Sequence, residues 1–214
     1  RMHVQVGKMG RQRAHDANYR GESGGGQATE DKERRQHMNK LSGKTAIVTG
    51  GGSGIGEGIA LALATSGANV VICGRRAASL ARVAEAIRAA GGNVHSEAAD
   101  VSRQEDAERV VAAALERFGA VHILVNNAAI GGGGPVHEYD VAAWDEVMAV
   151  NLRGPFLMSR AVLPHMRQRR EGHILNISSE SGIEYYEGDG GYGLSKHALN
   201  ALGEYIQREN QAYG

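Results

Sequence analysis

Tyr192 and Lys196 form a pair of side chains that could transfer a proton. They are four positions apart in a stretch with helical periodicity, so they share one face of the predicted helix. A lysine ammonium beside a tyrosine favours the phenolate form, which makes the pair a usable acid–base couple at neutral pH. Taken alone, this spacing is found in many helices, and a surface pair would be the simpler interpretation.

Polar residues after two predicted strands strengthen the catalytic interpretation. Ser179 directly follows a predicted strand and precedes Tyr192 by thirteen residues. Ligands bind at the carboxyl ends of parallel strands, so Ser179 is placed to hold a substrate carbonyl or hydroxyl against Tyr192. Asn127 and Ala128 follow the preceding strand, where they are candidate cofactor contacts. Asn151 lies within the next helix, where an amide more often bonds locally or faces solvent.

A glycine-rich segment, Thr49–Gly56, directly follows the first predicted strand and opens the first helix. Glycines at such a turn let the backbone approach a pyrophosphate, and the helix N-terminus offers unpaired N–H groups and a positive dipole end. Its place in a strand–turn–helix unit favours dinucleotide binding over a loop that merely needs glycine. The candidate cofactor contacts in it are Thr49, Gly50, Gly52, Ser53, Gly54, Ile55 and Gly56.

The end of the second predicted strand indicates which dinucleotide is bound. Arg75 and Arg76 follow it, at the place where the adenosine ribose would lie and where an acidic residue would favour a free 2′-hydroxyl. Guanidinium groups suit a 2′-phosphate, so NADP(H) is favoured, with NAD(H) and two merely solvated arginines as the alternatives. Asp100 and Val101, after the third strand, are candidate adenine contacts or part of an ordinary strand-end turn.

Short β-branched runs alternate with alanine-rich helical stretches from Leu41 onward, which predicts an α/β fold. Right-handed crossovers then favour a parallel sheet covered by helices on both faces. We expect a Rossmann-type, doubly wound parallel sheet of five strands in the order 3-2-1-4-5. The predicted strands are Thr45–Thr49, Asn69–Cys73, Val94–Ala98, Val121–Asn126 and His173–Ser178. The predicted helices are Ile55–Ser66, Ala77–Ala90, Arg103–Phe118, Val141–Arg170 and Tyr192–Ala212. Ser102 and Glu105 predict a capping box at the start of the third helix.

Residues 1–40 differ in composition from the rest of the chain. They hold nine Lys and Arg, five Asp and Glu, and no Leu, Ile, Phe or Trp. The burial of so few apolar side chains does not offset the conformational entropy lost when the segment becomes ordered. We therefore expect a disordered extension in residues 1–40, followed by a domain in residues 41–214.

Whole-chain composition excludes several classes of partner. The 24 Lys and Arg balance the 24 Asp and Glu, so neither a nucleic-acid nor a membrane partner is expected. Cys73 is the single cysteine, no apolar run approaches the length of a membrane span, and the histidines lack metal-ligand spacing. We therefore expect a cytoplasmic protein without a metal site.

Taken together and in this order, the motifs resemble the short-chain dehydrogenase/reductase family, from about Leu41 to the last residue. The pattern Thr-Gly-x-x-x-Gly-x-Gly at Thr49–Gly56 is combined with the strand-end serine and with Tyr-x-x-x-Lys. The resemblance implies an NAD(P)-dependent oxidoreductase that transfers a hydride between the nicotinamide and a carbonyl or secondary alcohol. Ala129 stands where the family usually has glycine.

The resemblance also assigns roles to single residues. It implies that Tyr192 exchanges the proton, that Ser179 orients the carbonyl, and that Asn151 anchors a water in a proton relay. Lys196 is implied to hold the nicotinamide ribose, so Tyr192 and Lys196 count among the cofactor contacts as well as the catalytic residues.

Family members continue beyond the helix that carries the tyrosine, with two further strands and a substrate-covering loop. The resemblance therefore implies a C-terminally incomplete domain whose fifth strand is an exposed edge. It also implies a homo-oligomer, a dimer or tetramer, in the full-length form, built on the helices around 141–170 and 192–212.

Two functions of different classes stay open. The favoured one is an oxidoreductase acting on a small carbonyl or alcohol, such as a 3-oxoacyl thioester, polyol, sugar or small ketone; the acidic segment 183–191 favours a hydroxylated substrate. The alternative is a catalytically inactive nucleotide-binding or oligomer-scaffolding fragment. An epimerase-type relative with the same Tyr/Lys pair is disfavoured by the glycine spacing in Thr49–Gly56.

Overall fold

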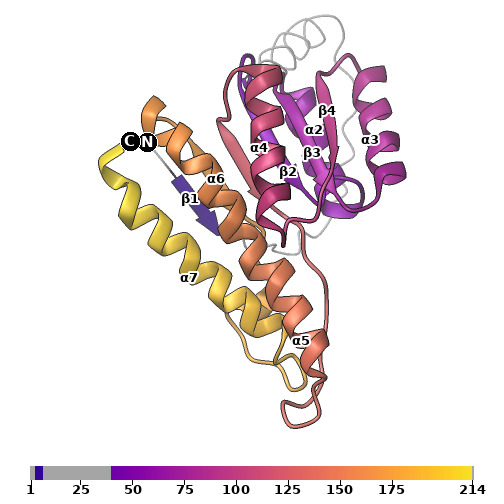
Figure 1. Ribbon diagram of the computed structural model, residues 1–214, viewed down its shortest axis with the longest axis vertical. Helices are drawn as coiled ribbons and strands as arrows, with labels where there is room; N and C mark the ends of the chain where they lie inside the picture. Colours follow the sequence, from indigo (N-terminus) through magenta and orange to yellow (C-terminus); the bar gives the residue numbers. More distant parts are fainter. Residues whose placement is uncertain (1–2, 7–39, 214) are drawn as a thin grey trace, which may run out of the picture.

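In the described part of the chain, six parallel strands form one sheet in the order β1-β6-β5-β2-β3-β4 (Figure 1). The computed structural model describes residues 3–6 and 40–213. The strands are β1 (His3–Val6), β2 (Thr45–Thr49), β3 (Asn69–Gly74), β4 (Val94–Ala98), β5 (Ile123–Asn126) and β6 (His173–Asn176). From β2 onward they follow the predicted order 3-2-1-4-5, so the prediction of a Rossmann-type α/β fold is confirmed.

The helices begin and end within a few residues of their predicted bounds. They are α2 (Gly54–Thr65), α3 (Ala77–Ala89), α4 (Gln104–Phe118), α5 (Val141–Met148), α6 (Gly154–Arg169) and α7 (Tyr192–Asn210). The single helix predicted at 141–170 is α5 and α6 joined by a π-helical turn, η1 (Ala149–Arg153). Short 3-10 turns, η2 (Glu180–Gly182) and η3 (Gln211–Tyr213), precede and follow α7.

Strand β1 is a feature that the composition of residues 1–40 did not predict. Its four residues pair in parallel with β6, His3 opposite His173 and Val6 opposite Asn176. The expectation of disorder is therefore wrong for residues 3–6, and the expectation that the fifth strand is an exposed edge is wrong as well. The reason is that an edge strand offers unpaired backbone N–H and C=O groups, which four residues of extended chain are enough to satisfy. The predicted disorder of residues 7–39 lies outside the described residues.

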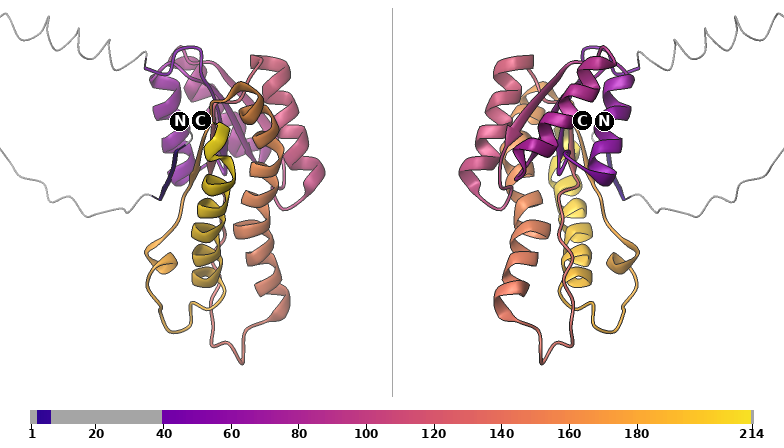
Figure 2. Two further views of the ribbon diagram at one scale, coloured as in Figure 1. Left: turned by 90° about the vertical axis from the view of Figure 1, so that its left-hand side faces the viewer. Right: turned by 90° about the vertical axis from the view of Figure 1, so that its right-hand side faces the viewer.

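Alternate side chains of the central strands enter two separate cores, one on each face of the sheet. Ile47 of β2 packs in a core with residues of α4, α6 and α7, and its neighbour Val48 packs in a core with residues of α2 and α3. The period of two in a strand explains the division, since adjacent side chains point to opposite faces. Figure 2 shows the helices on either side of the sheet.

The predicted capping box at the start of α4 does not form. The N-cap residue is Arg103, and the Ser102 hydroxyl donates to Asp100 Oδ1 at 2.7 Å. Asp106 Oδ2 accepts the backbone N–H of Asp100 at 2.8 Å. The turn after β4 is therefore closed by two aspartates and a serine in place of Glu105.

Two findings concern the described part of the chain as a whole. Within residues 3–6 and 40–213, no helix is both long and apolar enough to cross a membrane. In the same residues, no three His, Cys, Asp or Glu side chains are grouped so that they could hold a metal ion.

Candidate active site

The glycine-rich turn is locked to the end of β5 by hydrogen bonds. Thr49 Oγ1 accepts the backbone N–H groups of Asn127 and Ala128, each at 3.0 Å, and Asn127 Nδ2 donates to Thr49 O at 2.9 Å. Gly50 has a φ of +67°, and a Cβ there would lie 2.8 Å from Asn127 Nδ2. Only glycine meets both demands, because any side chain at position 50 would separate the ends of β2 and β5 that Thr49 and Asn127 join.

The start of α2 faces solvent without a side-chain cap. Ser53, the N-cap residue, makes no capping hydrogen bond; instead Arg76 Nη2 donates to its hydroxyl at 3.2 Å. Ser53, Gly54 and Ile55 are all exposed. The first N–H groups of a helix have no partner within the helix, so this end of α2 is suited to an anionic group.

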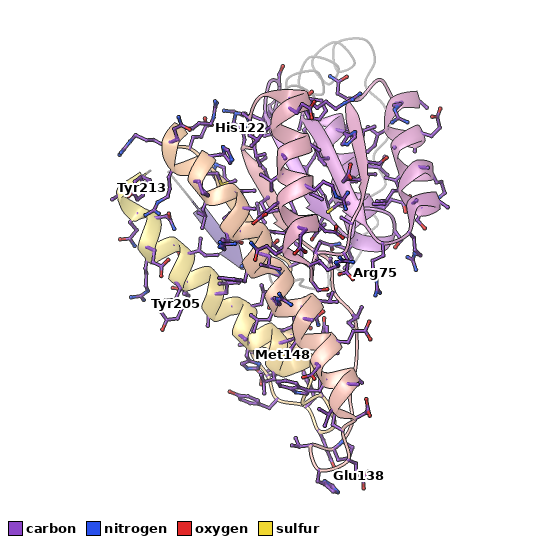
Figure 3. The ribbon with its side chains drawn as sticks, viewed as in Figure 1. Arg75, His122, Glu138, Met148, Tyr205 and Tyr213 are labelled. Carbon is purple, nitrogen blue, oxygen red and sulfur yellow. The ribbon has the colours of Figure 1, made fainter. Side chains whose placement is uncertain are left out.

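A cleft of about 330 Å³ lies beside this turn at the carboxyl ends of the strands. Nine of the predicted cofactor residues line it: Gly50, Gly52, Ser53, Arg75, Arg76, Asp100, Val101, Asn127 and Ala128. Thr49, Gly54, Ile55 and Gly56 build the turn but are not part of the lining, and neither are Tyr192 and Lys196. Figure 3 shows Arg75 on the side of the sheet that faces the projecting loops.

Several lining residues were missed by the sequence analysis. They are Gly74, Ser79, Leu80, Ala99, Ala129, Ile130 and Val150. Ser79 and Leu80 lie in the first turn of α3, which packs on the glycine turn; a Cβ at Gly52 would lie 3.2 Å from Ser79 Cβ. Their proximity to Arg76 in the sequence was a usable signal. Val150 adjoins the predicted Asn151, and the packing of η1 brings it to the cleft.

Arg75 and Asp100 both have partners within the protein. Arg75 Nη1 lies 3.4 Å from Glu146 Oε1 of α5, and more than half of each side chain is exposed. Asp100 Oδ1 accepts from the backbone N–H of Ser102 at 3.0 Å as well as from its hydroxyl. The mouth of the cleft thus carries one arginine in an exposed ion pair and one carboxylate oxygen committed to a turn.

The predicted tyrosine and lysine share one face at the start of α7. Lys196 is 3% exposed, and its Nζ lies 5.5 Å from the centroid of the Tyr192 ring. The same nitrogen donates to Ile177 O at 2.8 Å. Burial lowers the pKa of Lys196 to about 8, because the charged form loses solvation in the interior. A buried ammonium beside a phenol can stabilise the phenolate, which suits the ring to proton transfer.

Ser179 stands at the entrance of η2 with its hydroxyl proton uncommitted to the turn. Its Oγ accepts the backbone N–H of Ser181 at 3.2 Å. The hydroxyl proton is therefore left to donate to another oxygen.

Asn151 lies on the π-helical turn η1 and connects the cleft to α7. Its Nδ2 donates to Ile130 O at 2.9 Å and to Ser195 Oγ at 3.1 Å, and its Oδ1 accepts from Ile130 N at 2.8 Å. The side chain is 1% exposed and bonds across the fold, contrary to the ordinary behaviour of a helical amide. π turns are frequent at functional sites because they redirect a side chain out of the helical register.

Comparison with known proteins decides the family. A model of the short chain dehydrogenase family matches residues 44–214. The chain belongs to the short-chain dehydrogenase family. It is 38% identical over 173 residues to an uncharacterized oxidoreductase of Staphylococcus saprophyticus. The matched region covers 80% of this chain and 74% of that protein. Membership of this family makes the chain an oxidoreductase.

Solved structures of the same family superpose closely on this chain. A metagenomic short-chain oxidoreductase in complex with NADP is 40% identical, with a TM-score of 0.78 over 81% of this chain and 79% of that one. NAD+-bound xylitol dehydrogenase is 30% identical, with a TM-score of 0.80 over 82% of this chain and 68% of that one.

In this short-chain dehydrogenase, two loops near Tyr192 pack against the side chain of Tyr139. One loop contains Gly132 and the other contains Gly191. A Cβ at Gly132 or at Gly191 would lie 2.5 Å from the Tyr139 hydroxyl oxygen. The loops are also joined by a hydrogen bond from Gly134 N to Gly188 O at 2.6 Å. Sequence analysis missed Tyr139, because the two glycines that make room for its hydroxyl lie in loops far apart in sequence.

Proposed function

We propose that this chain is an NADP(H)-preferring reductase or dehydrogenase that acts on a small carbonyl or secondary alcohol. The observation that carries the proposal is the position of the buried Lys196 ammonium, between Ile177 O and the Tyr192 ring, on a helix that Asn151 ties to the cleft. The residues present fit a dinucleotide, because an uncapped helix start and a glycine turn face the cleft.

The side chains divide the proton chemistry between them. A bound nicotinamide supplies or accepts the hydride. The Ser179 hydroxyl donates a hydrogen bond to the substrate oxygen and holds that oxygen toward Tyr192. The Tyr192 hydroxyl gives its proton to that oxygen in the reducing direction and takes it back in the oxidising direction. Lys196 stabilises the phenolate and holds the nicotinamide ribose. The anchoring of a relay water by Asn151 stays a prediction.

The preference for NADP(H) rests on Arg75 and Arg76. Two guanidinium groups at the end of β3 suit a 2′-phosphate, and Arg76 already donates to Ser53 beside the uncapped helix. Relatives of known structure were solved with NADP in one case and NAD in others. Asp100 and Val101 would contact the adenine.

The proposal is tested by titrating the purified chain with NADPH and with NADH. Binding is measured by the change in nicotinamide fluorescence. We expect NADPH to bind at least about tenfold more tightly, the effect of one good charge-assisted contact. Turnover is then assayed with small hydroxylated ketones. Binding without turnover of any carbonyl substrate would favour the alternative, an inactive nucleotide-binding or scaffolding protein.

A homo-oligomer is favoured by the exposed apolar side chains of α5, α6 and α7. A shallow cavity of about 500 Å³ is lined by residues that include Met148, Leu152, Phe156 and Leu202. Phe156 and the Tyr205 ring are 48% and 66% exposed, and Figure 3 shows Tyr205 on the outer side of α7. Such a face suits a symmetric contact with a second copy. Phe156→Glu should lower the mass measured by light scattering, and an unchanged mass would place the contact elsewhere.

A further inference from the structure

The segment that carries Ser179 packs against α7 backbone to backbone. A Cβ at Gly182 would lie 3.2 Å from Lys196 O, and a Cβ at Gly193 would lie 3.2 Å from Ser181 O. Both contacts are tighter than a side chain ordinarily tolerates. Because glycine stands on each side, the 3-10 turn η2 lies directly on the helix.

Two side chains of α7 hold the two ends of this segment. Lys196 Nζ donates to Ile177 O at 2.8 Å, before Ser179. Asn200, one helical turn further along, donates from Nδ2 to Gly182 O at 2.9 Å, after Ser179. Ser179 is therefore held between a lysine anchor and an asparagine anchor, and the proposed function uses only the lysine.

Hydrogen bonds connect Ser181 and Gly182 to the two oxygens of Ser179. Gly182 N donates to Ser179 O at 3.0 Å, and Ser181 N donates to Ser179 Oγ at 3.2 Å. A shift of Gly182 would therefore move the Ser179 backbone and redirect its hydroxyl. Asn200 Oδ1 is buried without a hydrogen-bond partner among the described residues, so donation to Gly182 O is the contact through which this amide acts.

We propose that Asn200 is a positioning residue that sets the direction of the Ser179 hydroxyl by holding η2 against α7. The inference rests on the proposed function, in which Ser179 holds the substrate oxygen. Asn200 is not among the residues that line the cofactor cleft, and its amide donates to the segment that carries Ser179. Its effect should therefore fall on kcat and on the substrate rather than on the affinity for the nicotinamide cofactor.

Asn200→Asp tests the proposal, because aspartic acid has nearly the same shape and donates only when protonated. At neutral pH the carboxylate faces Gly182 O without a proton, so kcat should fall about tenfold, the effect of one lost hydrogen bond. As the pH is lowered and the carboxyl takes up a proton, kcat relative to the unmodified chain should recover. Asn200→Ala should lose a similar factor without recovery, and the KM for NADPH should be unchanged in both.

Asn210→Asp is the matched control. Asn210 is also buried on α7 and donates to a backbone carbonyl, Ile206 O at 2.7 Å. Its Oδ1 has no hydrogen-bond partner among the described residues, but Asn210 lies almost three helical turns from Asn200. Its variant should unfold at a lower temperature while kcat stays unchanged. Equal losses of kcat in the Asn200 and Asn210 variants, or no pH-dependent recovery, would overturn the proposal.

A second measurement does not depend on turnover. Amide hydrogen exchange at Ser181 and Gly182 should be faster in Asn200→Asp than in the unmodified chain at neutral pH, and unchanged in Asn210→Asp. Unchanged exchange in the Asn200 variant would refute the proposal that Asn200 holds η2 against α7, even if the chain is an active reductase. An inactive unmodified chain would refute the proposed function, and exchange would still decide whether Asn200 holds the turn.

Discussion

The ammonium of Lys196 lies 5.5 Å from the centre of the Tyr192 ring and donates to Ile177 O, at the end of the strand that precedes Ser179. The buried Lys196 ammonium thus lies between α7, which carries Tyr192, and the segment after β6, which carries Ser179. Its burial costs stability, since burial lowers its pKa to about 8 from an ordinary value of 10.5.

Lys196→Met should reveal this cost through its pH dependence. Between pH 8 and 10.5 the folded chain binds fewer protons at this site than the unfolded chain, so the lysine's penalty is full below pH 8 and vanishes above 10.5. Relative to the variant, the unmodified chain should gain up to about 3 kcal/mol of unfolding free energy across that window. Urea unfolding at several pH values measures the difference, and a difference independent of pH would contradict the argument.

Glu146→Gln should strengthen NADPH binding by releasing Arg75. Their exposed ion pair, at 3.4 Å, is worth up to about 1 kcal/mol, so the Kd for NADPH should fall by no more than about fivefold. The Kd for NADH should not change. Glu138→Gln is the control, since Glu138 lies on the projecting loop, far from Arg75 in Figure 3. An equal effect on both cofactors would mean that Arg75 does not contact a 2′-phosphate.

Gly56→Ala should damage the nucleotide turn, while Gly58→Ala on the same helix should not. A methyl at Gly56 would overlap Gly50 O, whereas one at Gly58 meets nothing within 4 Å. We expect loss of NADPH binding in the first variant. The second should gain about 0.8–1 kcal/mol of stability from better helix propensity. Retained NADPH affinity in Gly56→Ala would show that the turn can relax without harm.

His122 should make the fold less stable in mild acid. It is 6% exposed, and its Nδ1 accepts Thr45 N–H at 3.0 Å. Burial lowers its pKa below 6.5, helped by Lys44 and Arg169 and opposed by Glu171. The unfolded chain therefore binds more protons below pH 6.5, and stability falls as the pH falls through that value.

His122→Asn checks this account, because it keeps an acceptor near Thr45 N–H and cannot titrate. The slope of unfolding free energy against pH should flatten below pH 6.5, where the unfolded histidine takes up its proton before the folded one. An identical slope in both proteins would assign the acid sensitivity to other groups. Figure 3 places His122 and Arg75 toward opposite ends of the sheet, so NADPH binding serves as the internal control.

The strands from β2 onward and the helices could be predicted from sequence because their apolar residues follow the period of a strand or a helix. The glycine turn could be predicted because Thr49–Gly56 is one local motif. Strand β1 could not, since its pairing with β6 depends on a tertiary edge. Asn151 could be named as a candidate from its residue type and its position in the family pattern. Its hydrogen bonds to Ile130 and Ser195 could not be predicted, because they arise from the π turn. Tyr139 was missed because Gly132 and Gly191, which make room for its hydroxyl, are far apart in sequence.

The most direct test of the proposed function is the rate of NADPH oxidation by Tyr192→Phe with a carbonyl substrate that the unmodified chain reduces. Removal of the phenolic hydroxyl removes the proton donor and leaves the cleft lining intact. We expect kcat to fall by about 10²- to 10⁴-fold, a far larger effect than any change in the Kd for NADPH, because Lys196 still holds the ribose. A variant that keeps the activity of the unmodified chain would contradict the assignment of Tyr192 as the acid–base group.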